Sequence, residues 1–207
     1  MHAELSDFVH VFRPSESGDP VTLLMLHGTG GNEESLLPFA QSLRQSAAVL
    51  SPRGAVLENG LPRFFKRFAE GVFDEEDMKL QTAKLHRFID SAAAAYGFDR
   101  NKVVAVGYSN GANIAASLIL RNAQSLHGAV LFRATLPFEP ANPPEGEGVR
   151  VLICAGEEDP YAPRAKVERL IEVLEAGGVE VKVRWQHGGH ELTSPEIEEA
   201  ANWLKSL

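Results

Sequence analysis

The sequence has little of several features that mark particular classes of protein. It has one cysteine, Cys154, so an internal disulfide is excluded, and the apolar residues around it predict a buried, unreactive thiol. No apolar run is long enough to cross a bilayer. Lys and Arg number 20 against 28 Asp and Glu, a net charge of −8. This balance argues against nucleic acid or an anionic membrane as the main partner.

The chain also shows no sign of targeting or of division into parts. Residues 1–5 lack the basic and apolar regions of a secretory signal, so we expect a cytoplasmic protein. The 207 residues, 44% of them hydrophobic and 23% charged, are sufficient for one domain, 1–207, with a substantial core. No internal repeat or interdomain linker interrupts it.

Short apolar runs alternate with segments of helical period along the chain. The apolar runs predict strands at 8–12, 21–26, 47–50, 103–106, 129–132, 151–155 and 179–185. Helices are predicted from Glu33 to Leu43, over 75–96 with Gly97 as the stop, over 112–120 and 163–176, and from Ser194 as N-cap to 207. The alternation predicts an α/β fold, a mostly parallel twisted sheet of about seven strands with helices on both faces.

One strand-to-helix junction contains the pattern G-x-S-x-G. Gly107-Tyr108-Ser109-Asn110-Gly111 lies between the predicted strand 103–106 and the predicted helix 112–120. Glycines lack Cβ atoms, so the strand and the helix can pass close to the serine, whose hydroxyl is presented above the sheet. The backbone N–H of Asn110, at the helix N-terminus, can face a negative charge. The pattern in this context predicts that Ser109 is a nucleophile.

A serine nucleophile needs a base and an acid that orients it, and candidates follow two later strands. Glu157, Glu158 and Asp159 come after the strand 151–155, and His187 and His190 come after the strand 179–185. Because parallel strands end at one edge of a sheet, we expect both loops to lie beside Ser109. The residues alone leave open which carboxylate and which histidine act.

Residues 55–74 fit neither a helical nor a strand period and are predicted to form an excursion over the sheet edge. Their aromatic side chains have two interpretations, a satellite core under a loop or the wall of an apolar acyl or aryl pocket. The predicted pocket residues are Phe64, Phe65, Phe68, Leu136, Phe138 and Tyr161. Arg133, directly after a strand, either anchors a loop or meets an acidic substrate group.

Four motifs in order resemble the bacterial phospholipase/carboxylesterase family of α/β-hydrolases, which is related to acyl-protein thioesterases. They are Leu26-His27-Gly28-Thr29-Gly30-Gly31, Gly107–Gly111, Gly156–Pro163 and Gly189-His190-Glu191-Leu192. The serine, acid, histidine order is that of α/β-hydrolases. The resemblance implies that Ser109, Asp159 and His190 form a triad, that Thr29 and Asn110 supply oxyanion N–H groups, and that His27 braces the oxyanion loop.

The resemblance further implies a small-molecule ester substrate, no metal or organic cofactor, a minimal cap, and a homodimer as an alternative to a monomer. The chain departs from these relatives in two places. Asn110 replaces their usual glutamine, and 63–67 does not match the loops that bind long acyl chains. Because of the second departure, the resemblance does not identify which ester is the substrate.

The sequence is compatible with three kinds of function. The ordered motifs favour a serine esterase, and the same residues would serve an acyl thioesterase. The cluster His187, His190 and Glu191 prompts a metal-dependent dioxygenase, although its spacing is not that of a helical zinc motif and it leaves Ser109 unexplained. A non-catalytic binding protein of the same fold is the third alternative.

Overall fold

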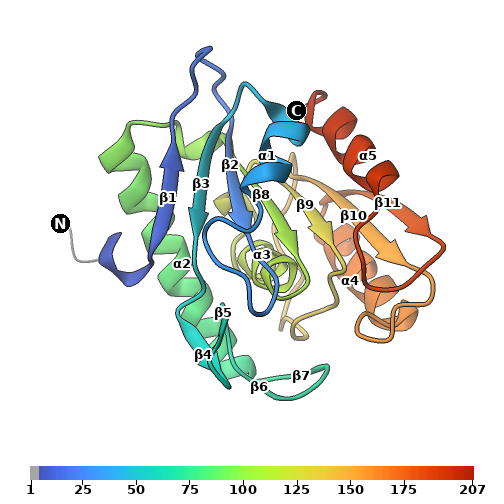
Figure 1. Cartoon of the computed structure of the whole chain (residues 1–207). Helices are drawn as coiled ribbons and strands as arrows, with labels where there is room; N and C mark the ends of the chain where they lie inside the picture. The colour runs from blue at the N-terminus through green and yellow to red at the C-terminus, as the bar shows by residue number, and fades with distance from the viewer. Residues whose placement is uncertain (1–4) are drawn as a thin grey trace.

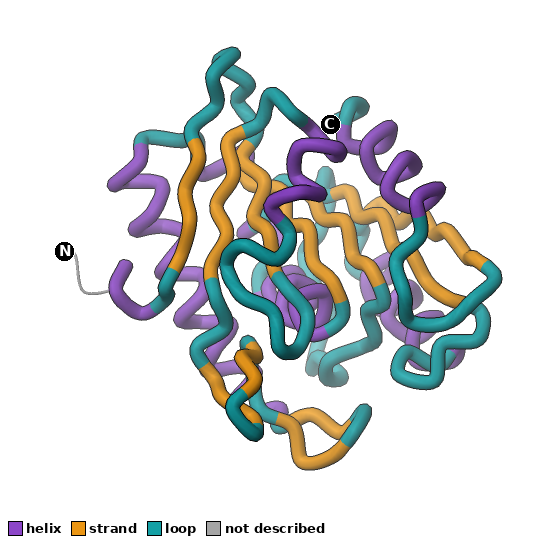
Figure 2. The backbone as a smooth tube through the Cα atoms, viewed as in Figure 1, coloured by secondary structure: helices purple, strands orange, loops and turns teal. Residues whose placement is uncertain are grey.

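A seven-stranded sheet runs through the middle of the protein (Figures 1 and 2). The computed structural model describes residues 5–207. The strand order is β1-β3-β2-β8-β9-β10-β11, and all neighbouring strands are parallel except β1, which pairs antiparallel with β3. The strands are β1 (His10–Arg13), β2 (Thr22–Leu26), β3 (Ala48–Pro52), β8 (Val103–Tyr108), β9 (Gly128–Phe132), β10 (Arg150–Gly156) and β11 (Glu180–Gln186). The predicted mostly parallel sheet is confirmed.

Helices cover both faces of the sheet, as the sequence predicted. In the view of Figure 1, α1 and α5 lie in front of the sheet and α2, α3 and α4 lie behind it. Each face has its own apolar core, one packed against each set of helices. The helices are α1 (Leu37–Arg44), α2 (Glu75–Tyr96), α3 (Asn110–Arg121), α4 (Arg164–Ala176) and α5 (Ser194–Leu204), with short 3-10 turns at Leu5–Asp7, Arg100–Lys102 and Ala123–Ser125. None of the helices in residues 5–207 has the length and hydropathy needed to cross a membrane.

The strand order determines which loops become neighbours. Strand β8 lies between β2 and β9, and β10 and β11 follow on the β9 side. Because these strands are parallel, their carboxyl ends lie at one edge of the sheet. The loops that follow β2, β8, β9, β10 and β11 therefore come together at that edge, and every predicted catalytic residue lies in or beside one of them.

Four helix starts differ from the predicted ones: α3 begins at Asn110 rather than 112 and α4 at Arg164 rather than 163, and α1 and α5 also differ. Helix α1 begins at Leu37 rather than Glu33, because 32–35 form turns in which the Asn32 side chain accepts from the N–H of Glu34 (2.9 Å). The N-cap of α5 is Thr193 rather than Ser194, and it forms a capping box with Glu196. Helix α2 and its stop agree with the prediction, with Gly97 at φ 75°.

The segment 55–74 forms two short hairpins, which the sequence analysis did not predict. Their strands are β4 (Val56–Glu58), β5 (Leu61–Arg63), β6 (Arg67–Ala69) and β7 (Val72–Phe73). Asn59 (φ 51°) and Gly60 (φ 80°) make the tight turn of the first hairpin, and Gly71 (φ 69°) lies at the turn of the second. Both hairpins lie beyond the carboxyl edge of the sheet, at the bottom of Figure 1.

Candidate active site

Ser109 occupies a strained turn between β8 and α3. Its backbone has φ 52° and ψ −112°, a combination that a residue with a side chain rarely adopts and that costs about 1–3 kcal/mol. Two backbone hydrogen bonds hold it. The Ser109 N–H donates to the carbonyl of Phe132 (2.9 Å), and the Ser109 carbonyl accepts from the N–H of Asn113 (2.9 Å). The strain is therefore maintained by β9 on one side and by α3 on the other.

The two glycines of the turn are needed for space. A Cβ atom on Gly107 would lie 2.5 Å from the carbonyl oxygen of Gly111, and one on Gly111 would lie 2.0 Å from that of Leu26. Both distances are far inside van der Waals contact with backbone atoms that cannot move independently. The close approach of strand and helix predicted from the glycines is confirmed.

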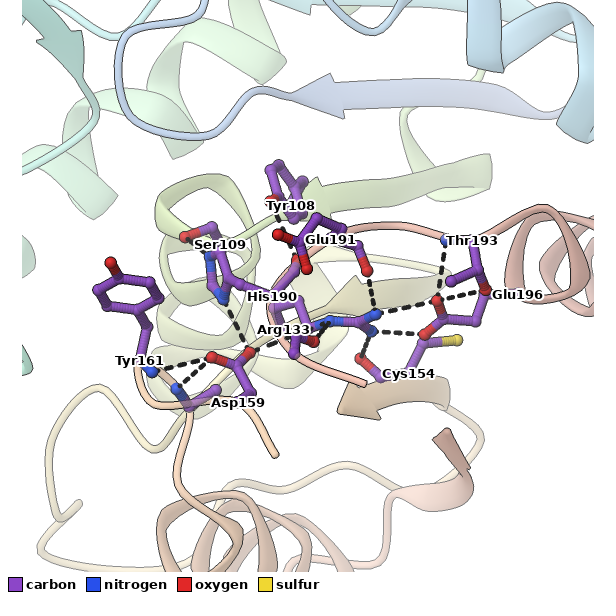
Figure 3. Close-up of polar contacts among 12 residues, drawn as sticks. Tyr108, Ser109, Arg133, Cys154, Asp159, Tyr161, His190, Glu191, Thr193 and Glu196 are labelled. Atoms are coloured by element: carbon purple, nitrogen blue, oxygen red, sulfur yellow. Dashed lines mark hydrogen bonds and ion pairs between the residues drawn. The ribbon is translucent and has the colours of Figure 1, made fainter. Parts of the chain in front are cut away.

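His190 lies between Ser109 and Asp159 (Figure 3). Its Nε2 is 2.8 Å from Ser109 Oγ, and its Nδ1 is 2.7 Å from Asp159 Oδ2. An ionised carboxylate only accepts hydrogen bonds, so the proton of the neutral ring is on Nδ1 and the Nε2 lone pair faces the serine hydroxyl. The structure thus brings together the three residues that the sequence predicted as a triad.

The carboxylate of Asp159 is fixed from its other side. Its side chain is inaccessible to solvent, and Oδ1 accepts from the backbone N–H groups of Tyr161 (2.8 Å) and Ala162 (3.1 Å). Neither neighbouring glutamate competes for the histidine. The Glu157 carboxylate contacts the ring of His187, whose side chain is 94% exposed, and Glu158 is exposed.

The three residues proposed for a metal site do not converge. Both ring nitrogens of His190 are occupied by Ser109 and Asp159, and His187 pairs instead with Glu157. Within residues 5–207, no group of three or more His, Cys, Asp or Glu side chains is arranged to hold a metal ion. The geometry therefore does not favour the dioxygenase hypothesis.

Arg133 holds the loop that carries His190. Its guanidinium donates to the carbonyls of Gly189 (3.0 Å) and Glu191, one on each side of the histidine, and makes a two-point ion pair with Glu196 at the start of α5. Both side chains of that ion pair are at most 1% exposed. Burial alone would lower the pKa of Arg133, but the hydrogen bonds and charge of Glu196 outweigh it and raise that pKa. Of the two roles considered, the contacts are those of a loop anchor.

Two tyrosines flank the His190 ring. The Tyr161 ring meets it edge-on at 5.1 Å between centroids, and Tyr161 is 51% exposed. On the other side, the Tyr108 ring lies at 5.4 Å and its hydroxyl donates to the His190 carbonyl (3.1 Å). Tyr161 was predicted to line a pocket, whereas no role was predicted for Tyr108. The only sequence signal for a role of Tyr108 was its position directly before Ser109.

Thr29 and Asn110 are held by two consecutive residues, Arg63 and Phe64. Thr29 belongs to the loop after β2, and its hydroxyl accepts from the Arg63 guanidinium (2.7 Å). Asn110 begins α3 and is 3% exposed; its side-chain oxygen accepts from the N–H of Phe64 (2.7 Å). Both side chains are therefore tied to β5 and the residue after it. A buried arginine with this role was missed, because nothing in the mixed composition of 63–68 shows that Arg63 faces inward.

His27 braces the loop after β2, in the way expected. Its Nδ1–H donates to the carbonyl of Gly28 (2.7 Å), and Nε2 accepts from the N–H of Gly54 (2.9 Å). The ring packs against Phe64 at 4.8 Å. Burial lowers the pKa of His27, which keeps the ring neutral and preserves Nε2 as an acceptor.

The residues predicted to line a substrate pocket are not gathered in one cavity. Phe64 and Phe65 are at most 1% exposed and belong to the core shared with α2 and α3, whereas Phe68 is 75% exposed on β6. Phe64 and Phe65 follow β5 where the chain turns inward, so the packed-core interpretation describes them. Leu136 and Phe138 line a cleft of about 490 Å³ between the β6–β7 hairpin and the start of α4.

Comparison with known proteins agrees with this architecture. Residues 10–207 match the family model described as phospholipase/carboxylesterase. The chain is 46% identical over 196 residues to the putative hydrolase MhqD of Bacillus subtilis, covering 95% of this chain and 97% of that protein.

Two solved carboxylesterases resemble the structure. The Bacillus cereus carboxylesterase superposes with a TM-score of 0.92 at 48% identity, covering 96% of this chain and 94% of that one. A carboxylesterase from Mesorhizobium loti superposes with a TM-score of 0.89 at 28% identity, covering 97% and 96%. The chain therefore belongs to the phospholipase/carboxylesterase family and is an α/β-fold hydrolase.

Proposed function

We propose that the protein is a serine esterase that cleaves carboxylic esters through Ser109, His190 and Asp159 and an acyl-enzyme intermediate. Family membership supports an esterase activity. The observation that carries the finer proposal is the continuous hydrogen-bond chain from Ser109 Oγ through His190 to the buried Asp159 carboxylate.

In the acylation step, Ser109 Oγ attacks the ester carbonyl while its proton passes to His190 Nε2. The carbonyl π pair moves onto oxygen, and that oxyanion is stabilised by the backbone N–H groups of Thr29 and Asn110. Each such donor contributes about 3–4 kcal/mol in comparable enzymes. The electron pair then returns, the C–O bond of the leaving alcohol breaks, and His190 protonates the departing oxygen.

Deacylation repeats these steps with water as the nucleophile. His190 removes a proton from the water, hydroxide adds to the acyl carbon, and Ser109 leaves with the proton that the imidazolium returns. Asp159 stabilises the imidazolium in both halves and remains ionised, held by two backbone N–H groups.

Tyr161 is the substrate contact that this proposal favours among the predicted pocket residues. It is half exposed and lies against His190, so a group bound near the serine would meet its ring. We expect Tyr161→Ala to raise KM for aryl esters more than for acetyl esters of small alcohols.

The test is labelling with a fluorophosphonate together with hydrolysis of p-nitrophenyl esters of increasing length. Ser109→Ala should abolish labelling and lower kcat by about 10⁴-fold or more. Ser42→Ala, on the exposed side of α1, is the matched control and should behave as the unmodified enzyme. Labelling or turnover that persists in Ser109→Ala refutes the proposal. Acyl thioesters in the same panel separate an esterase from a thioesterase.

A further inference from the structure

The glycine-rich loop that carries Thr29 has one internal backbone bond, from the Gly31 N–H to the Gly28 carbonyl (3.1 Å), and a brace from His27. Gly28, Gly30 and Gly31 surround Thr29, and Gly30 has φ 80°. Glycines leave the backbone free to adopt many conformations, so a loop of this composition needs contacts from outside. Oxyanion stabilisation requires that the donor N–H be positioned before the reaction. The question is which residues supply that positioning.

The first hairpin supplies two contacts to the loop. The carbonyl of Pro62 accepts from the N–H of Gly30 (2.9 Å), and Arg63 Nη1 donates to Thr29 Oγ1 (2.7 Å). These bonds hold the residue after Thr29 and the Thr29 side chain itself. They come from adjacent residues of β5.

Arg63 is itself held rigidly. Its side chain is 3% exposed, its Nε lies 3.2 Å from Glu58 Oε2 and donates to the carbonyl of Phe65 (3.2 Å), and its guanidinium lies 5.6 Å from the Phe65 ring centroid. Burial is the largest influence on the pKa of Arg63 and lowers it. A buried cation with this many partners has little freedom to move and cannot reach solvent.

The next residue reaches the other donor. The N–H of Phe64 donates to Asn110 Oδ1 (2.7 Å), and Asn110 lies at the start of α3. The backbone of Arg63 and Phe64 packs directly on Gly54, which follows β3. The approach is so close that a Cβ atom on Gly54 would lie 2.3 Å from the Arg63 carbonyl carbon. Two consecutive residues therefore contact both residues that carry the proposed oxyanion donors.

We propose that Arg63 is a positioning residue that aligns the Thr29 N–H with the oxyanion, while the Phe64 N–H aligns Asn110. The inference rests on the proposed function, since it assumes that these two N–H groups serve the oxyanion. It assigns a role to a segment whose sequence departs from the acyl-binding loops of related thioesterases. Arg63 acts through Thr29 and does not touch the substrate.

Removing the guanidinium should affect the transition state more than substrate binding. Loss of one well-placed oxyanion donor lowers kcat by about 10²–10³-fold. A donor that is displaced rather than lost should cost less, so we expect Arg63→Met to lower kcat by about 10–100-fold. KM should change by less than about threefold, because the ground-state carbonyl depends little on the oxyanion donors.

The experiment measures kcat, KM, the rate of fluorophosphonate labelling and thermal stability for a set of variants. Arg63→Met and Thr29→Val remove the same hydrogen bond from its two ends, and Thr29→Val retains the backbone N–H. Each should slow labelling and turnover in parallel, and the double variant should be no slower than the worse single one. Thr29→Ser, which keeps a hydroxyl, should retain at least tenfold more kcat than Thr29→Val.

Arg67→Met is the matched control, because Arg67 lies in the same charged cluster and pairs with Glu58 and Glu70 without contacting Thr29. Its kcat should stay within about twofold of the unmodified enzyme. If Arg63→Met does not fold, Thr29→Val gives the same readout from the loop side.

The outcomes separate this inference from the proposed function. The role of Arg63 is overturned if Thr29→Val has normal kcat, or if Arg63→Met has a lower melting temperature but normal kcat. In either case, an inactive Ser109→Ala still supports the esterase proposal. Full activity in Ser109→Ala overturns the proposed function itself. Independent, multiplicative losses in the double variant also contradict the positioning role, since they would show that the two side chains do not act through one bond.

Discussion

Replacing Arg133 by methionine should weaken both the fold and the reaction. The substitution leaves the carboxylate of Glu196, which is inaccessible to solvent, without its cation, and removes the donor to the carbonyls of Gly189 and Glu191. Breaking a buried ion pair by removing one partner costs about 3–5 kcal/mol. Arg133 has φ 60°, and methionine would retain that strained backbone, so backbone strain does not confound the comparison.

For a chain of this size, the loss corresponds to a fall in melting temperature of about 6–20 °C, at about 2–4 °C per kcal/mol. Equilibrium unfolding in urea measures the free energy directly. Hydrolysis should also slow, because the loop on both sides of His190 loses its anchor. We expect kcat to fall.

The double variant Arg133→Met with Glu196→Gln identifies the cause. Glutamine at 196 still accepts from Thr193, so the capping box of α5 persists, while the unpaired charge is gone. The double variant should therefore be more stable than Arg133→Met alone, yet equally slow, because the carbonyls beside His190 remain without a donor. An unfolding free energy of Arg133→Met within 1 kcal/mol of the unmodified protein would refute the reasoning, and so would a double variant less stable than the single one.

Three further predictions concern His27, Cys154 and Ser109. Burial lowers the pKa of His27, so the His27 ring takes up a proton more readily in the unfolded chain than in the folded protein. The melting temperature should therefore decline as the pH falls below about 6.5, and His27→Gln should flatten that dependence. Burial raises the pKa of the Cys154 thiol to about 12, so iodoacetamide should neither label nor inhibit the native enzyme, yet should label it in denaturant. Ser109→Gly should be more stable than the equally inactive Ser109→Ala by about 0.5–2 kcal/mol in urea unfolding, because glycine relieves the positive φ at some cost in chain entropy; equal stabilities would show that the turn stores no strain.

The sheet and its long helices were predictable because their patterns extend over many residues. Helix α2 was predicted with its observed bounds, and each strand of the main sheet was predicted to within a few residues. The hairpins of 55–74 were missed because strands of two or three residues are too short to show alternation, although Asn59-Gly60 is a recognised hairpin turn. For α5, Glu196 three residues after Thr193 was a capping-box signal that went unused.

The triad residues of the site were predictable from the sequence, but the residues that hold the surrounding loops in place were not. Strand order brought Ser109, Asp159 and His190 to one edge of the sheet, and that follows from parallel strands. Spacing could not distinguish His187 from His190, because the choice depends on which ring turns inward within one short loop. The inward direction of Arg63 was equally hidden, since burial of a cation depends on tertiary partners distant in sequence.

The two hairpins divide their residues between the interior and the surface. The stretch 63–65 points into the body of the protein, whereas Leu57, Phe68 and Val72 are each more than half exposed. Substitutions at these exposed positions can therefore accumulate without disturbing the buried contacts of 63–65. A combinatorial library restricted to these three outward positions should give folded proteins that keep the interior contacts of 63–65.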